Sequence, residues 1–224
     1  MSSPARAHRD RVLARRASAE AASGVKPLQH ATAYELMLAK LDADRRRLKA
    51  VQSVKKKIEV KRELLPDYAG WIDGVLAGDS GVQDEVVMTV LVWRIDTEDY
   101  DGALAIADYA LRHHLKLPGQ YNRTLGCVLA EEFADQALRA LAEKREPALE
   151  ALERVDLLTA GEDMPDEVRA KLNKAIGLTL EAEQPEAAVE RLRNALTLHA
   201  AVGVKKDIER IERAIRNKAG DKST

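Results

Sequence analysis

Residues 32–66 read TAYELMLAKLDADRRRLKAVQSVKKKIEVKRELLP, and this stretch decides the fold. Thr32, with Glu35 three residues later, has the form of a capping box that starts a helix, and Pro66 ends one. The apolar residues between them recur about every 3.5 positions; they are Tyr34, Met37, Leu41, Leu48, Val51, Ile58 and Leu65, with Asp44 breaking the stripe once. The pattern predicts one helix from Thr32 to Leu65, about 50 Å long. Its apolar stripe needs a packing partner, in the same chain or in a neighbouring subunit.

The other faces of this predicted helix are basic. Two clusters of cations lie about ten residues apart, or roughly 15 Å along the axis: Arg45, Arg46, Arg47 and Lys49, then Lys55, Lys56, Lys57, Lys61 and Arg62. A basic run on a helix is most often a solvated surface. Here few Glu residues stand four positions away to neutralise it, and the spacing of the clusters suits several backbone phosphates. The pattern therefore favours a polyanionic ligand.

Upstream of this helix, residues 1–26 are rich in Arg, Ala and Ser and lack the apolar run of a secretory signal. They predict a mobile basic arm, partly helical or becoming so on binding. Its candidate phosphate contacts are Arg9, Arg11, Arg15 and Arg16. Residues 1–63 hold 16 Lys and Arg against 7 Asp and Glu, whereas the other 161 residues hold 20 against 30. A net charge of −1 therefore hides a basic N-terminal third on an acidic body.

Downstream, the Gly- and Asp-rich residues 66–82 predict a boundary between the basic helix of residues 27–65 and an acidic helical body over residues 66–200. Residues 201–224 form a C-terminal helix and tail. Helices are expected near residues 84–94, 102–115, 123–144, 147–158, 165–181, 185–199 and 205–218. The apolar pattern of residues 100–111 recurs at 185–196, which is typical of αα-hairpins of tetratricopeptide type. The fold class is all-α: a long basic N-terminal helix followed by a tetratricopeptide-like helical body.

No pattern of catalysis is present in the sequence. It has no G-x-x-x-x-G-K-[ST] loop for a nucleotide and no H-E-x-x-H pair for a metal. The adjacent His113 and His114 point about 100° apart on a helix, and Cys127 has no neighbouring His, so we interpret all three as structural. No apolar run approaches the roughly 20 residues that span a bilayer. We therefore expect no enzyme activity, no metal, no cofactor and no membrane.

The polyanion is better matched by duplex DNA than by a single strand. The chain has one Phe, two Trp and five Tyr, and single-strand binding depends on stacking of bases on aromatic side chains. A duplex can be held through its phosphates by Lys and Arg alone. The sequence shows no clear short helix–turn–helix, so no residue is assigned to reading bases.

Five stretches also resemble a known family. They are residues 3–6 (SPAR), 28–41 (LQHATAYELMLAKL), 61–66 (KRELLP), 88–97 (MTVLVWRIDT) and 164–172 (MPDEVRAKL). In order and spacing, across nearly the whole chain, they resemble the small terminase subunit of P2-like tailed bacteriophages.

The resemblance implies a non-enzymatic protein of the host bacterial cytoplasm. Such a subunit recognises the packaging site on viral DNA, assembles into a homo-oligomeric ring and delivers DNA to the large subunit, whose ATPase and nuclease it regulates. The two cation clusters and the arm would contact DNA. The stripe of Tyr34, Met37, Leu41, Leu48, Val51 and Ile58 would pack between subunits.

Two other functions stay open on the sequence. One is a tetratricopeptide-like adaptor that binds proteins and whose basic helix is merely solvated. The other is a regulator that binds DNA as a dimer without forming a ring. The dependence of duplex binding on salt separates the first from a terminase subunit, and the size of the assembly separates the second.

Overall fold

The computed structural model describes residues 4–23, 28–119 and 123–221. These residues form eleven α-helices and one short 3-10 helix, with no strand among them, so the predicted all-α class is confirmed. The chain divides into two compact units, residues 1–122 and 123–224. The first contains α1 (Pro4–Ser23), α2 (Leu28–Ala50), α3 (Val54–Leu64), η1 (Leu65–Asp67), α4 (Ala69–Gly78), α5 (Glu85–Asp96) and α6 (Tyr100–Arg112).

The single helix expected from Thr32 to Leu65 is wrong, because two helices occupy this stretch. α2 starts four residues earlier than expected, at Leu28, and ends at Ala50, and α3 starts at Val54. Between them Ser53 has an extended backbone, and its hydroxyl accepts a hydrogen bond from the amide of Lys56. Serine is a favoured N-cap because it satisfies an amide that the first turn of a helix leaves without a partner. The pair α2–α3 is therefore two helices joined by a three-residue turn, the general form of a helix–turn–helix.

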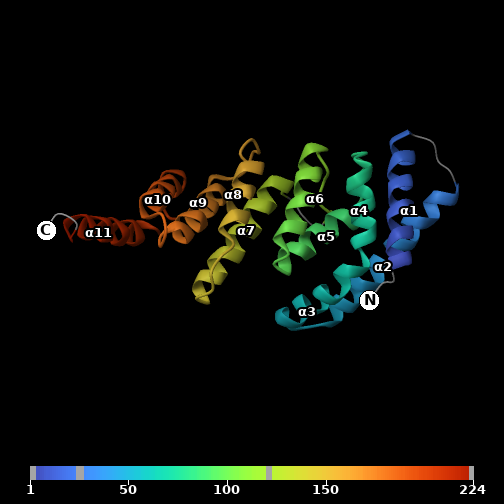
Figure 1. Cartoon of the computed structure of the whole chain (residues 1–224), viewed down its shortest axis with the longest axis horizontal. Coiled ribbons are helices and arrows are strands. Elements are labelled where there is room, and N and C mark those ends of the chain that lie inside the picture. Colours follow the sequence, from blue (N-terminus) through green and yellow to red (C-terminus); the bar gives the residue numbers. More distant parts are fainter. Residues whose placement is uncertain (1–3, 24–27, 120–122, 222–224) are drawn as a thin grey trace. The chain divides into compact units, whose positions relative to one another are not determined.

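Residues 4–23 of the predicted basic arm form α1, as the helix-favouring Ala and Arg of this stretch allow, and pack beside α4 (Figure 1). The predicted boundary at residues 66–82 instead contains η1 and α4, inside the first unit. A Cβ added to Gly70 would lie 2.7 Å from the carbonyl oxygen of Ala7, and one added to Gly74 would lie 2.4 Å from that of Arg11. Glycines disfavour a helix by about 1 kcal/mol each. Here they let two helix backbones approach closely, and that contact offsets the cost.

The core of the first unit lies around α5. Val86, Val87 and Leu91 are fully buried, and Tyr68 packs edge-on against Trp93 at 5.8 Å between ring centroids. Asp84 is the N-cap of α5 and accepts hydrogen bonds from the amides of Val86 and Val87 and from the indole of Trp71. Burial raises the pKa of the Asp84 carboxyl, and these three donors oppose that shift. α5 is thus the central helix against which α2, α3 and α6 are placed.

The second unit contains α7 (Leu125–Ala142), α8 (Leu149–Leu158), α9 (Asp166–Leu180), α10 (Pro185–Leu198) and α11 (Lys205–Asp221). Successive helices pack as neighbours, and α9 also packs on α7. The repeat found in the sequence falls on α6 and α10, each of which packs on the helix before it. Equivalent residues are buried in both copies: Ala103 and Ala188, Leu104 and Val189, Ala107 and Leu192, Ala110 and Ala195.

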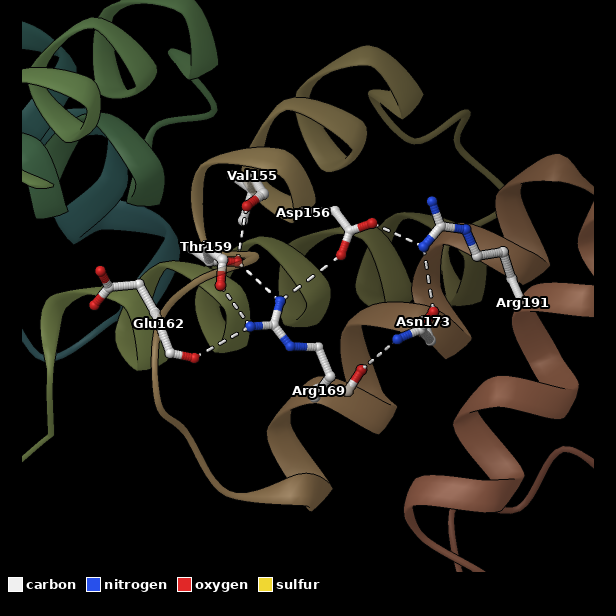
Figure 2. Close-up of polar contacts among 7 residues, drawn as sticks. All are labelled: Val155, Asp156, Thr159, Glu162, Arg169, Asn173 and Arg191. Atoms are coloured by element: carbon white, nitrogen blue, oxygen red, sulfur yellow. Dashed lines mark hydrogen bonds and ion pairs between the residues drawn. The ribbon is translucent and has the colours of Figure 1, made fainter.

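A polar network joins α8, α9 and α10 (Figure 2). The guanidinium of Arg169 donates to the carbonyl of Thr159 at 2.5 Å and to its hydroxyl at 3.1 Å, at the C-terminal end of α8. Arg191, on α10, binds Asp156 at 2.7 Å and the side-chain oxygen of Asn173 at 3.3 Å. Carbonyls at a helix C-terminus lack partners in the helix and attract cations. The network therefore ties three consecutive helices together.

Candidate nucleic-acid interface

The candidate interface lies where α2 ends and α3 begins. The last turn of α2 and the first turn of α3, on either side of the turn of residues 51–53, carry exposed or half-exposed Lys and Arg side chains. Leu48, Val60 and Leu64 are buried beneath them and hold the two helices on the unit. The turn thus places Arg46, Arg47 and Lys49 at the end of α2 next to Lys55, Lys56 and Lys57 at the start of α3, while Lys61 and Arg62 lie in the last turn of α3.

Four of the nine predicted cations have side chains without a hydrogen bond or ion pair to any described residue. We call Arg46, Lys49, Lys55 and Lys57 the free cations. Two of them lie in the first turns of α3, which has no carboxylate in its first turn. The N-terminus of a helix is its positive end, so lysines there are unfavourable and an anion is favoured. A phosphate at this end would be stabilised both by the lysines and by the helix.

Three other predicted cations bind α5 of their own chain, and we call Arg45, Lys61 and Arg62 the bound cations. The guanidinium of Arg45 binds the carboxylate of Glu85 at 2.6 Å and donates to the hydroxyl of Thr89 at 2.8 Å. Lys61 donates to the carboxylate of Asp96, and Arg62 donates to the carbonyl of Thr97 at 3.2 Å. All three side chains are therefore engaged within the chain, although Arg62 stays exposed.

The remaining two cations of the clusters form ion pairs on the surface of the helix pair. Arg47 binds Glu63 at 2.6 Å, and Lys56 binds Glu59 at 3.0 Å. The side chains of Arg47 and Glu63 are 51% and 57% exposed. Exposed pairs contribute little to stability, so a phosphate can replace such a carboxylate at small cost. We call these the surface pairs.

The arginines predicted in the N-terminal arm lie exposed on α1. Arg9 is 3.5 Å from the carboxylate of the adjacent Asp10. Arg11, Arg15 and Arg16 have no side-chain partner among the described residues. Because α1 packs on α4 and α2, these side chains belong to the same unit as the free cations.

Half of the apolar stripe expected between subunits is occupied within the chain. Leu41 and Leu48 are buried, and the ring of Tyr34 stacks on Trp71 at 6.0 Å. These three residues were expected to pack between subunits, but in the structure this face of α2 packs on its own unit. Met37, Val51 and Ile58 are half-exposed. Leu36, outside the stripe, is 72% exposed.

Asp44, which breaks the stripe, is accounted for by a buried tyrosine. The hydroxyl of Tyr68 donates to the Asp44 carboxylate at 2.6 Å, and Lys40 binds the same carboxylate at 2.6 Å. The Lys40 ammonium also lies 4.3 Å from the centre of the Tyr68 ring. Burial, and then the bond to Asp44, raise the pKa of Tyr68 far above its usual value. The polar residue in the stripe is thus a further attachment of α2 to the unit.

Of the three residues weighed for catalysis, His113 has a partner and Cys127 is buried, whereas His114 is exposed. His113 binds Asp79 at 2.8 Å and packs on the ring of Tyr109. Cys127 is buried, and that burial raises the pKa of its thiol. Within the described ranges no three His, Cys, Asp or Glu side chains gather as ligands for a metal ion. No helix in those ranges has the length and apolarity to cross a membrane.

A comparison with known families matches residues 38–167, more than half of the chain, to the phage small terminase subunit. The protein belongs to this family, as the resemblance predicted, and the assignment supports a role in phage genome packaging. A relative from Escherichia phage P2, named "Terminase, endonuclease subunit", is 46% identical over 219 residues, which cover 97% of this chain and 87% of the relative. No solved structure matches the chain.

Proposed function

We propose that this small terminase subunit binds duplex DNA at the α2–α3 turn through the free cations. The observation that carries the proposal is the sorting of charge on these two helices. Five of the nine cations bind groups of their own chain, whereas the four free cations, which flank the turn, have no partner among the described residues. Side chains of one sign, collected at the positive end of a helix, favour a phosphate backbone. The arginines of α1 extend this surface as auxiliary contacts.

The test compares two variants that lose the same charge. In the first, Arg46, Lys49, Lys55 and Lys57 are replaced by Gln. In the control, four exposed cations of α11 without a described partner are replaced by Gln: Lys205, Lys206, Arg213 and Lys218. Affinity for a fluorescent duplex is measured by anisotropy between 50 and 200 mM salt. Each phosphate contact contributes about 0.9 to the slope of log K against log salt, so the first variant should lose about 3 to 4 and the control none.

Equal losses in both variants would mean that DNA responds to net charge alone and not to the turn. No loss in the first variant would refute the site, and an absence of duplex binding by the wild type at low salt would favour the protein-binding adaptor. Circular dichroism melting of each variant shows whether the fold is kept.

We further propose that the subunit assembles into a homo-oligomeric ring. The family assignment supports this, and Met37, Val51 and Ile58 stay available as contacts, joined by the exposed Leu36. Native mass spectrometry tests the assembly, since a dimer as the largest species would favour a dimeric regulator. Leu36→Asp should reduce the assembly, while the substitution of the exposed Asp73 of α4 by Asn should not.

The proposed ring passes viral packaging-site DNA to the large terminase subunit in the host bacterial cytoplasm and regulates the ATPase and nuclease of that subunit. The acidic body is the proposed docking surface, because its negative charge keeps DNA away from it. The P2 relative is named an endonuclease subunit, so the division of labour needs a direct test. Supercoiled plasmid is incubated with Mg²⁺ and either this chain, the large subunit or both. Cleavage by this chain alone would overturn a purely regulatory role.

A further inference from the structure

The α2–α3 pair is attached to α5 at both ends of that helix. Arg45 reaches Glu85 and Thr89 in its first two turns, whereas Lys61 and Arg62 reach Asp96 and Thr97 at its end. Glu85 and Asp96 are eleven residues apart, or about 16 Å along the axis. Two attachments at this distance fix the orientation of the helix pair as well as its position. They add to the burial of Leu48, Val60 and Leu64, which also holds the pair on the unit.

The two ion pairs of these attachments are less exposed than the surface pairs, with the side chains of Arg45 and Glu85 at 30% and 46%, whereas Arg62 is an exposed residue. The side chains of Lys61 and Asp96 are 17% and 30% exposed, whereas those of Arg47 and Glu63 are 51% and 57% exposed. Ion pairs are screened less as they leave water. Thr89 is buried, and its hydroxyl also donates to the carbonyl of Glu85, so the Arg45 contact has a defined geometry. Arg62 donates to the carbonyl of Thr97, which is the C-cap of α5 and lies at the negative end of that helix.

We propose that the bound cations are positioning residues for DNA binding: they hold the α2–α3 pair on α5 so that the free cations meet successive phosphates together. This rests on the function proposed above. Its consequence is that the carboxylates of Glu85 and Asp96, although negative, favour the binding of a polyanion. A direct phosphate contact by Lys61 makes the opposite prediction, because Asp96 would then only compete with DNA.

These two cases predict opposite changes in duplex affinity when the charge of Asp96 is removed. Asp96→Asn keeps the size of the side chain and removes one negative charge. If the bound cations do not position the helix pair, duplex affinity should rise slightly, as it should when the exposed Asp73 of α4 is replaced by Asn. If the bound cations hold the helix pair in place (bracing), Asp96→Asn should weaken duplex binding about threefold to tenfold. The salt slope should stay unchanged, because no phosphate contact is lost. Tighter binding by Asp96→Asn would overturn the proposal.

A charge-swapped pair keeps the test decisive if a single variant unfolds. Lys61→Glu alone should weaken binding, and Lys61→Glu combined with Asp96→Lys should restore most of the affinity because the attachment is re-formed. If Lys61 contacts phosphate itself, the double variant stays as weak as Lys61→Glu. The free-cation variant is measured beside them. If it binds like the wild type, the proposed function fails; if it loses affinity while Asp96→Asn gains, the bracing alone fails.

Discussion

Arg45 and Arg46 are adjacent in the chain and alike in chemistry, yet the fold uses them differently. Arg45 is held by Glu85 and Thr89 of α5, and Arg46 is exposed without a partner among the described residues. The same contrast separates Lys61 from Lys55 on α3. A basic stretch is therefore not one surface. Part of its charge supports the fold, and the part left over is available to a ligand.

The largest expected effect on stability comes from replacing Arg45 and, for comparison, Arg46. Arg45→Met removes two hydrogen bonds of a charged group and should lower the free energy of unfolding by about 1 to 2 kcal/mol. Arg46→Met, with the same change in charge, should leave stability within about 0.5 kcal/mol. Urea unfolding followed by circular dichroism measures both. Equal destabilisation by the two would remove the distinction between bound and free cations.

Most helices could be predicted from the sequence, because apolar spacing and Pro or Gly punctuation are local. α10 begins at Pro185 and α11 at Lys205, as expected. The end of α2 could not be predicted from the apolar spacing, which continues across the turn; Ser53 was the one local signal. α4 was missed because its glycines disfavour a helix in isolation, and only the approach of α1 accounts for them.

The nine cations of the candidate site come from the sequence, and their contact with DNA stays a prediction. Their division into bound and free side chains could not be predicted, because nothing local distinguishes those that bind α5. The partners of Arg45 and Lys61 lie 40 and 35 residues further along the chain. Sorting these cations requires the tertiary fold, since a charge pattern reports how much charge is present and not what already neutralises it.

A second, intermediate effect comes from the tyrosine that holds α2 beside the bound cations. The pKa of Tyr68 is raised in the folded protein by burial and by its bond to Asp44. An unfolded tyrosine loses its proton near pH 10, so stability is fully present below that pH and is lost as the pH rises above it, by up to about 1.4 kcal/mol per unit. Unfolding in urea between pH 8 and 11 measures this loss.

Burial also raises the pKa of Tyr34 and Tyr109, so these residues contribute a loss of the same sign. Tyr68→Phe provides the control, because it removes one titrating group and keeps the ring that packs on Trp93. The variant should be less stable than the wild type at pH 8 and should lose less stability by pH 11. Parallel curves for the two proteins would show that Tyr68 ionises as easily folded as unfolded.

The smallest expected effect is at Glu63. Removing this carboxylate should strengthen duplex binding, whereas removing the carboxylate of Asp96 should weaken it. Glu63 neutralises Arg47 on the surface of the helix pair, where both side chains are more than half exposed. Glu63→Gln should change stability by less than about 0.5 kcal/mol, since exposed pairs contribute little. It leaves Arg47 as a fifth cation without a carboxylate near the turn, so duplex affinity should rise by about twofold and the salt slope should steepen by up to about 0.9.

Anisotropy titrations of Glu63→Gln and Asp96→Asn, run side by side, measure the difference in duplex affinity between them. Weaker binding by both variants would place Arg47 among the bound cations, whereas opposite signs at these two carboxylates would show that α5 braces the site and Glu63 only screens it.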